Sequence, residues 1–216
     1  MVKVKICGLT NEADALAAAE AGADFLGFVF APSPRQVEPE LVRTIVGCLP
    51  QGVSTVGVFV DAPLQKVQST LDFCHLDYAQ LHGAEPPEYV YALAPRAIKA
   101  FPLRSRLEAE EQLLALEKAF AQLNSRFPLL LLDSRRPGAA GGTGELSDWA
   151  LAREIASCHP VILAGGLKPE NVAQAVGEVA PWGVDVSSGV ERSPGLKDHG
   201  KICRFVRAAK DAVWRL

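Results

Sequence analysis

The feature that most constrains the fold of this 216-residue chain is a repeated alternation of short apolar runs with longer segments of helical spacing. Short apolar runs that stop in polar or glycine-rich turns are typical of buried strands. Strands that alternate with helices predict parallel βαβ units. The expected strands cover residues 2–7, 25–30, 54–60, 77–82, 97–102, 128–133, 160–164 and 183–187, and the expected helices cover residues 12–22, 39–48, 63–74, 86–94, 105–123, 147–157, 169–178 and 199–215.

Eight strand-and-helix pairs in a chain of this length predict a closed (β/α)8 barrel, the TIM barrel, as a single domain over residues 1–216. A doubly wound open sheet is the alternative. Glycine-rich segments follow the last three expected strands, where such barrels often bind phosphate, and they favour the barrel. Helix signals agree with this division, since Asn11 can cap the first helix, Gly22 can end it and Pro63 opens the third.

Composition and charge argue against several classes of protein. A formal net charge of -3 provides no basic surface for nucleic acid. No apolar run is long enough to span a bilayer, and the first residues begin a strand without the layout of a signal peptide, so we expect a cytoplasmic protein with no membrane contact. The 5 cysteines are scattered and form no C-x-x-C pair, which predicts neither a disulfide framework nor a zinc site.

Cys7 ends the first expected strand and shares a strand face with Lys5, because side chains alternate along a strand. A buried parallel strand carries such a polar face where one end opens onto a polar site. Catalytic residues of TIM barrels lie at these carboxyl ends. Cys7 is therefore a candidate acid/base group, and Lys5 a cation that would favour its thiolate. The alternatives are a small buried filler for Cys7 and a structural ion pair for Lys5.

Asp133 closes the apolar run Leu129–Asp133 at the end of the sixth expected strand. Burial of a carboxylate raises its pKa and favours the protonated form, which suits a general acid. The alternative is a carboxylate that accepts hydrogen bonds from backbone amides of the next loop. His82 and Lys99 are weaker candidates at neighbouring strands. A lone histidine before a glycine is more often a structural residue, and pairing with a neighbouring acid is the alternative for Lys99.

Three consecutive loops rich in glycine and serine follow the last three expected strands. Their backbone amides can surround an anion, so we expect a phosphate site there. Arg35, in a loop stiffened by two prolines, is a candidate to bind a substrate carboxylate in a bidentate pair, and a solvated surface arginine is the alternative. The candidate phosphate-binding residues are Gly142, Gly165, Gly166, Ser187 and Ser188.

Taken in order, these segments and their neighbours resemble the phosphoribosylanthranilate isomerase family of tryptophan biosynthesis. The likeness covers nearly the whole chain and continues through Pro194-Gly195 and Lys197-Asp198. One departure is Ser147, where the family often has an aromatic residue before Asp148-Trp149. The matching segments are Lys5–Gly8, Gly27–Phe30 with Ser33 and Arg35, Gln80–Gly83, Leu132–Ser134, Gly141–Gly144, Leu163–Leu167 and Asp185–Glu191.

This resemblance implies an Amadori rearrangement of N-(5-phosphoribosyl)anthranilate, with no metal and no organic cofactor. It implies that Asp133 is the general acid and Cys7 the general base. Arg35 would hold the anthranilate carboxylate and the three loops the phosphate, and Lys5 and His82 complete the expected substrate-binding set. The expected partner is a small phosphorylated molecule that carries an anthranilate group, bound by a monomer or a homodimer.

Three other functions are alternatives to the phosphoribosylanthranilate isomerase activity. A histidine-pathway sugar isomerase would call for a carboxylate at the position of Cys7. The indole-forming synthase of the tryptophan pathway would be longer, with a pattern of catalytic lysine and glutamate that this chain lacks. A non-catalytic barrel that binds a phosphorylated ligand would tolerate apolar residues in place of Cys7 and Asp133.

Overall fold

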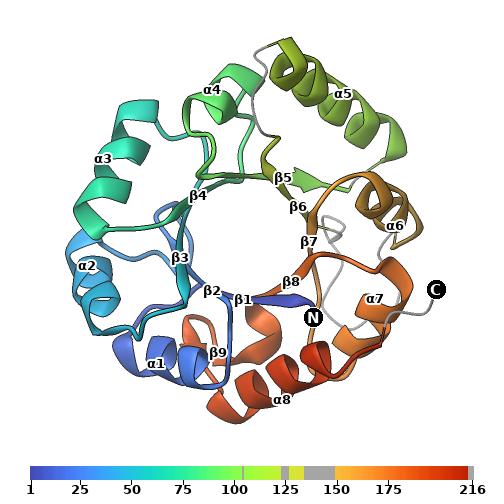
Figure 1. Ribbon diagram of the computed structural model, residues 1–216. Helices are drawn as coiled ribbons and strands as arrows, with labels where there is room; N and C mark the ends of the chain where they lie inside the picture. The colour runs from blue at the N-terminus through green and yellow to red at the C-terminus, as the bar shows by residue number, and fades with distance from the viewer. Residues whose placement is uncertain (104, 123–126, 134–148, 214–216) are drawn as a thin grey trace.

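The computed structural model describes residues 1–103, 105–122, 127–133 and 149–213. Within them, eight parallel strands form a closed barrel in chain order, surrounded by eight helices (Figure 1). The strands are β1 (Lys3–Cys7), β2 (Phe25–Val29), β3 (Ser54–Phe59), β4 (Tyr78–Leu81), β5 (Ala97–Pro102), β6 (Leu129–Asp133), β7 (Val161–Ala164) and β8 (Gly183–Val186). The helices are α1 (Glu12–Glu20), α2 (Pro39–Cys48), α3 (Leu64–Cys74), α4 (Pro87–Ala92), α5 (Arg106–Gln122), α6 (Trp149–Cys158), α7 (Val172–Val179) and α8 (His199–Lys210).

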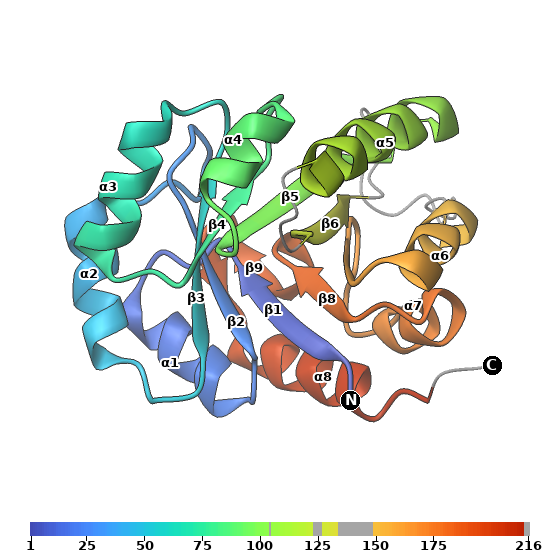
Figure 2. The same cartoon turned by 45° about the horizontal axis from the view of Figure 1, so that its top comes forward.

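Pairing between β1 and β8 closes the barrel. Lys5 stands opposite Asp185 in this pair, and Cys7 stands opposite Gly27 in the pair of β1 with β2. All eight barrel strands point the same way, so their carboxyl ends gather at one end of the barrel (Figure 2). The predicted TIM barrel is confirmed, and the open-sheet alternative is wrong.

The barrel wall separates two apolar cores, because side chains alternate between its faces. Residues such as Ile6 and Leu26 face outward and pack against the helices. The inner core is smaller and fills the barrel with Phe25, Val56, Ile98, Ala100, Leu131, Ile162 and Ala164. Polar inward-facing residues lie beyond this core towards the carboxyl ends of the strands. None of the helices in the described ranges is both long and apolar enough to cross a bilayer.

Local signals explain some of the helix boundaries. The Asn11 side chain caps α1 by accepting a hydrogen bond from the Asp14 amide, as predicted. Helix α7 begins at Val172, later than the predicted residue 169, because Asn171 holds the preceding turn through the Lys168 amide. Helix α8 ends at Lys210, short of the predicted residue 215.

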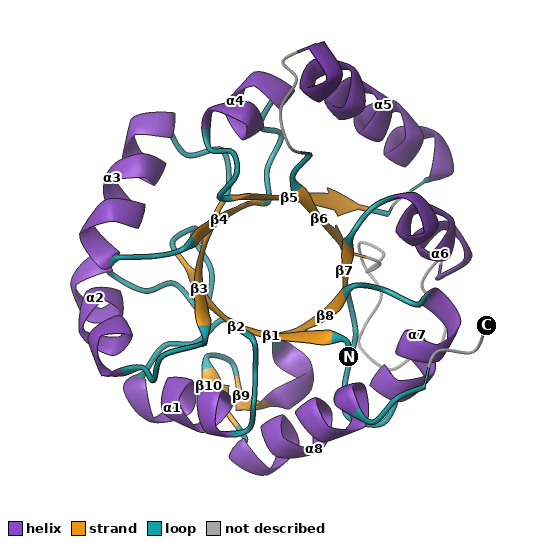
Figure 3. Cartoon of the chain, in the orientation of Figure 1, coloured by secondary structure: helices purple, strands orange, loops and turns teal. Residues whose placement is uncertain are grey.

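An additional hairpin precedes α8 and was not predicted. A short 3-10 helix, η1 (Ser188–Val190), leads into β9 (Glu191–Ser193), which pairs in an antiparallel manner with β10 (Leu196–Lys197). Figure 3 shows this hairpin outside the barrel wall, between α1 and α8. The Lys197 amide donates to Asp14 of α1, which fixes the hairpin against that helix.

Candidate active site

Cys7 and Lys5 are buried side by side at the carboxyl end of β1. Cys7 is 7% exposed and Lys5 1% exposed, and the Lys5 ammonium donates to Asp185 Oδ1 at 2.8 Å. A methyl group added to Gly27 would stand 2.9 Å from Cys7 Sγ and 3.2 Å from Lys5 Nζ. The absence of a side chain at Gly27 on β2 therefore makes room for both groups. Lys5 also forms a structural ion pair, with Asp185, which was the alternative interpretation of this residue.

The charges around Cys7 act on its pKa in opposite directions. Burial raises the pKa of the thiol, the Lys5 ammonium lowers it, and the Asp185 carboxylate raises it, so that the pKa stays above its ordinary value of 9.0. Lys5 behaves differently, since burial lowers its pKa but Asp185 and Cys7 outweigh burial and raise it. These directions favour the ammonium form of Lys5 and the neutral thiol form of Cys7.

Asp133 lies at the end of β6, beside His82. The Nε2 atom of His82 is 3.7 Å from Asp133 Oδ2, and its Nδ1 atom is 2.9 Å from the Gln80 amide nitrogen. An imidazole that accepts at Nδ1 carries its hydrogen on Nε2, which faces the carboxylate. The Asp133 side chain is 27% exposed, so its desolvation is partial, less than the apolar run suggests. Gln80 was not among the predicted site residues. Its side-chain amide contacts His82, which lies beside Asp133.

Arg35 reaches the same end of the barrel from the loop after β2. Its Nε and Nη2 atoms donate to the two carboxylate oxygens of Glu191, each at 2.7 Å. Gly8, at the end of β1, gives the arginine its path, because a methyl group there would stand 2.5 Å from Arg35 Cδ and 3.0 Å from Ser187 Oγ. Arg35 is therefore partly buried and paired with Glu191, and its binding of a substrate carboxylate stays a prediction.

The loops after β7 and β8 lie in contact, and their binding of phosphate stays a prediction. Gly165 and Gly166 adopt positive φ angles of 95° and 67°, a conformation that glycine accepts without strain. A methyl group on Gly189 of η1 would collide with the Leu167 carbonyl oxygen, so glycine permits the two loops to touch. Ser187 and Ser188 stand where β8 passes into η1. Gly142 and Ser147 lie outside the described residues.

Sequence reasoning missed the part played by the β9–β10 hairpin. Lys197 of β10 donates from its ammonium to the Cys7 carbonyl oxygen at 2.7 Å and to Glu191 Oε1 at 3.0 Å. Pro194-Gly195 was a usable turn signal for this hairpin. Lys99, by contrast, lies outside the barrel and donates to Glu85 at 2.7 Å, which is the structural role considered for it.

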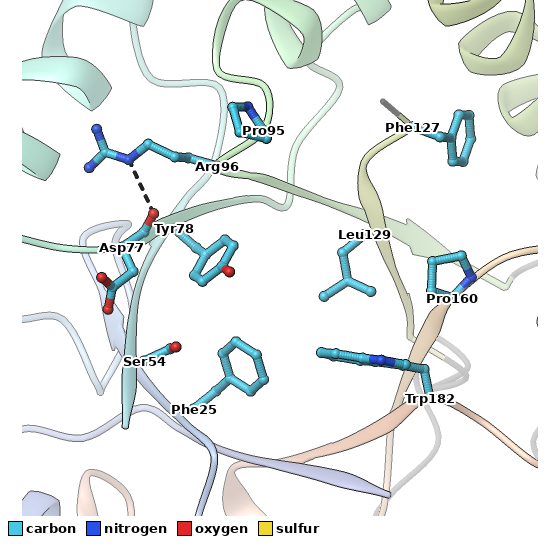
Figure 4. A pocket seen from close by; sticks show the side chains of 10 residues that line it. All are labelled: Phe25, Ser54, Asp77, Tyr78, Pro95, Arg96, Phe127, Leu129, Pro160 and Trp182. Atoms are coloured by element: carbon cyan, nitrogen blue, oxygen red, sulfur yellow. Dashed lines mark hydrogen bonds between the residues drawn. The ribbon is translucent and has the colours of Figure 1, made fainter. Parts of the chain in front are cut away.

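A pocket of about 460 Å³ lies at the opposite end of the barrel from Cys7 and Asp133. Figure 4 shows aromatic side chains from the amino-terminal ends of the strands, such as Phe25 and Tyr78, projecting into it with Trp182. Arg96 at its edge donates to the Asp77 carbonyl oxygen at 3.1 Å. Among the predicted site residues that the structure describes, none lines this pocket.

The fold and the site together define a class of protein. This TIM barrel presents a thiol, a carboxylate and an arginine at the ends of its strands, next to two glycine- and serine-containing loops that are in contact. Such an arrangement defines an enzyme suited to acid–base chemistry on a small anionic substrate.

Comparison with known proteins identifies the family. The family model for N-(5'-phosphoribosyl)anthranilate (PRA) isomerase matches residues 4–208. The N-(5'-phosphoribosyl)anthranilate isomerase of Geobacter sp. (strain M21) is 50% identical over 211 residues, which cover 97% of this chain and 98% of that protein. The chain belongs to the N-(5'-phosphoribosyl)anthranilate isomerase family, as the sequence resemblance implied.

Solved structures agree. The phosphoribosyl anthranilate isomerase of Thermotoga maritima superimposes with a TM-score of 0.85 at 42% identity, covering 97% of this chain and 99% of that one. A phosphoribosyl anthranilate isomerase in complex with reduced 1-(o-carboxyphenylamino)-1-deoxyribulose 5-phosphate gives a TM-score of 0.82 at 41% identity, with the same coverage. The chain is thus an isomerase of tryptophan biosynthesis, and the two other barrel enzymes and the non-catalytic barrel are not favoured.

Proposed function

We propose that Asp133 and Cys7 are the general acid and general base with which this chain converts N-(5-phospho-β-D-ribosyl)anthranilate to 1-(2-carboxyphenylamino)-1-deoxy-D-ribulose 5-phosphate. The observation that carries this proposal is their placement. Cys7 ends β1 and Asp133 ends β6, and both lie at the carboxyl end of the same barrel. Two separate proton-transfer groups at one rim suit a reaction that protonates one atom and deprotonates another.

The steps require one group of each kind. Asp133 donates its proton to the furanose ring oxygen, the bond from that oxygen to C1 breaks, and the anthranilate nitrogen forms a Schiff base with C1. Cys7, as its thiolate, then removes the proton from C2, which gives an enolamine. Return of a proton to C1 and loss of the C2 hydroxyl proton yield the ketone. Burial raises the pKa of Cys7 and disfavours the thiolate. Lys5 supports the reaction because its ammonium lowers that pKa.

The two ends of the substrate have separate anchors in this proposal. Arg35 binds the anthranilate carboxylate through the guanidinium donors that Glu191 does not use, including those on Nη1. Gly142, Gly165, Gly166, Ser187 and Ser188 bind the phosphate, while Lys5 and His82 contact the sugar between the anchors. Because a phosphorylated substrate crosses membranes poorly, we place the enzyme in the cytoplasm, where such a substrate is made and kept.

Turnover of N-(5-phosphoribosyl)anthranilate, followed by the loss of anthranilate-type fluorescence, tests the activity. The histidine-pathway substrate is run alongside at the same enzyme concentration. We expect rapid turnover of the first substrate and, at most, a small fraction of that rate with the second. Turnover of the histidine-pathway substrate alone, or binding of either without conversion, would contradict the assignment.

A further inference from the structure

The β9–β10 hairpin places a fully buried lysine directly behind the proposed base. The Lys197 side chain is 0% exposed. Its ammonium donates to the carbonyl oxygens of Cys7 and Ser187, at 2.7 Å and 3.2 Å, and to Glu191 Oε1 at 3.0 Å. One side chain therefore joins the end of β1, the end of β8 and the carboxylate that holds Arg35.

The charges of this cluster do not cancel. Glu191 is 5% exposed at its side chain and binds both Lys197 and Arg35. One carboxylate and two cations give a net charge of one positive unit (2 − 1 = 1). Lys5 and Asp185, in contrast, form a one-to-one pair inside the barrel. The hairpin cluster thus carries one positive charge in excess of its carboxylate.

Anchoring of the hairpin does not require the Lys197 ammonium. The Lys201 ammonium donates to the backbone oxygen of Glu191 at 2.8 Å, and the Asp14 carboxylate accepts from the Lys197 amide at 2.8 Å. The amide of Asp198 also donates to the Val190 oxygen. Because burial of a charged group is costly and apolar side chains can fill such a space, a buried lysine here calls for a role besides anchoring.

We propose that Lys197 and Glu191 are positioning residues of the active site. Lys197 fixes the backbone of Cys7 and Ser187 and places a positive charge beside the thiol. Glu191 orients Arg35 for the substrate carboxylate. The role of Arg35 toward substrate rests on the proposed function. The link between Lys197 and the Cys7 thiol does not, since it is a property of the empty site.

Four charged groups from different parts of the chain lie around Cys7, while β2 contributes only Gly27. Lys5 comes from β1 itself, Asp185 from β8, Lys197 from β10 and Arg35 from the loop after β2. After burial, which raises the pKa of Cys7, the two lysines lower it and Asp185 raises it. Burial lowers the pKa of Lys197 below its ordinary value of 10.5, although Glu191 and Cys7 act to raise it. The pKa of Arg35 is raised, first by its hydrogen bonds to Glu191 and also by Cys7. Loss of the Lys197 charge should therefore move ionisation of the thiol to higher pH.

Alkylation of Cys7 in the unliganded protein tests this coupling. The rate of modification by iodoacetamide is measured against pH, and the Cys7 peptide is quantified by mass spectrometry because the chain has other cysteines. We expect Lys197→Met to raise the midpoint by about 0.5 to 1 pH unit, as loss of a neighbouring cation does. Lys197→Gln, which keeps amide donors without the charge, should show the same shift, whereas Lys197→Arg should stay near wild type.

Lys201→Met is the matched control, because it removes a lysine that binds the same hairpin through its backbone. Its midpoint should stay within about 0.2 pH unit of wild type, since its ammonium binds the Glu191 backbone and not the Cys7 backbone, and its partial exposure lets solvent screen the charge. An unchanged midpoint in Lys197→Gln, or an equal shift in Lys201→Met, overturns the proposal. The Gln variant keeps the test available if Lys197→Met does not fold.

Kinetics of Glu191→Gln test the orientation of Arg35. We expect KM to rise about tenfold, because affinity is lost when a charged hydrogen-bonding partner is misplaced. We expect kcat to fall less than about threefold. Competitive inhibition by inorganic phosphate should stay within about twofold of wild type, because the phosphate loops are unaltered. A fall in kcat with unchanged KM, or no change in either, overturns this part. Failure of the proposed function itself is distinguishable, since wild type would then show no turnover.

Discussion

At the scale of single residues, Cys7 owes its position to a neighbour without a side chain. Gly27 stands opposite Cys7 across the β1–β2 pair, and an added methyl group would lie 2.9 Å from the thiol sulfur. Real Cβ atoms do not approach so closely, so the thiol or the Lys5 ammonium would have to move. Placement of the proposed base is thus encoded on two strands.

Gly27→Ala should therefore impair catalysis more than folding. We expect kcat to fall about tenfold or more, because small displacements of a catalytic group cost large factors in rate. The free energy of unfolding should fall by about 1–3 kcal/mol, the usual cost of an overpacked buried site. Steady-state kinetics and urea denaturation measure both quantities.

Gly47→Ala is the control, since Gly47 lies on the exposed face of α2 with open space at its Cβ position. This substitution should stabilise the protein by about 0.5–1 kcal/mol and leave kcat unchanged, because alanine favours a helix interior. Equal kcat values for Gly27→Ala and wild type would refute the steric account of Cys7.

At the scale of elements, contact between the β7–α7 loop and η1 assembles the proposed phosphate site. Gly189→Ala should separate these elements, since its methyl group would meet the rigid Leu167 carbonyl group. We expect KM to rise about tenfold or more, as charged hydrogen bonds to phosphate are lost, with a smaller effect on kcat. An inhibition constant for inorganic phosphate that stays at the wild-type value would show that η1 does not shape this site.

The barrel elements were predictable because each strand is a short apolar run that ends in a turn. The carboxyl-end rule then selected Cys7, Asp133 and the glycine loops from the sequence. The β9–β10 hairpin escaped prediction because strands of 3 and 2 residues have no readable periodicity. Its key residues, Glu191 and Lys197, are also of types that are seldom buried, so their partners became visible only in three dimensions.

At the scale of the whole molecule, carboxylates join distant parts of the chain. Asp14 of α1 binds the Lys197 amide and His199, and Asp24 binds Lys3 and Lys210. Burial alone would raise the pKa of each carboxyl, but these hydrogen bonds and charges outweigh it and hold the pKa below the ordinary value of 3.8. A depressed pKa in the folded state means that the contribution to stability is complete above about pH 4 and is lost as pH falls through the folded-state pKa.

Acid should therefore destabilise the protein, and Asp14→Asn should weaken that dependence. We expect the variant to be less stable than wild type at pH 7 but to lose less of its unfolding free energy between about pH 5 and pH 3. Urea denaturation at a series of pH values measures the difference. Identical acid dependence in the two proteins would show that Asp14 is not linked to folding in this way.

The central proposal for this enzyme is that Cys7 and Asp133 perform chemistry and do not hold the ligand. The most direct test measures two quantities for Cys7→Ala and Asp133→Asn. One is kcat, and the other is the dissociation constant of reduced 1-(o-carboxyphenylamino)-1-deoxyribulose 5-phosphate, which a related isomerase binds. We predict that kcat falls at least about 100-fold in each variant while the dissociation constant changes less than about tenfold, as expected for general acid–base groups. Near-normal turnover in either variant, or affinity lost in proportion to kcat, would contradict the claim.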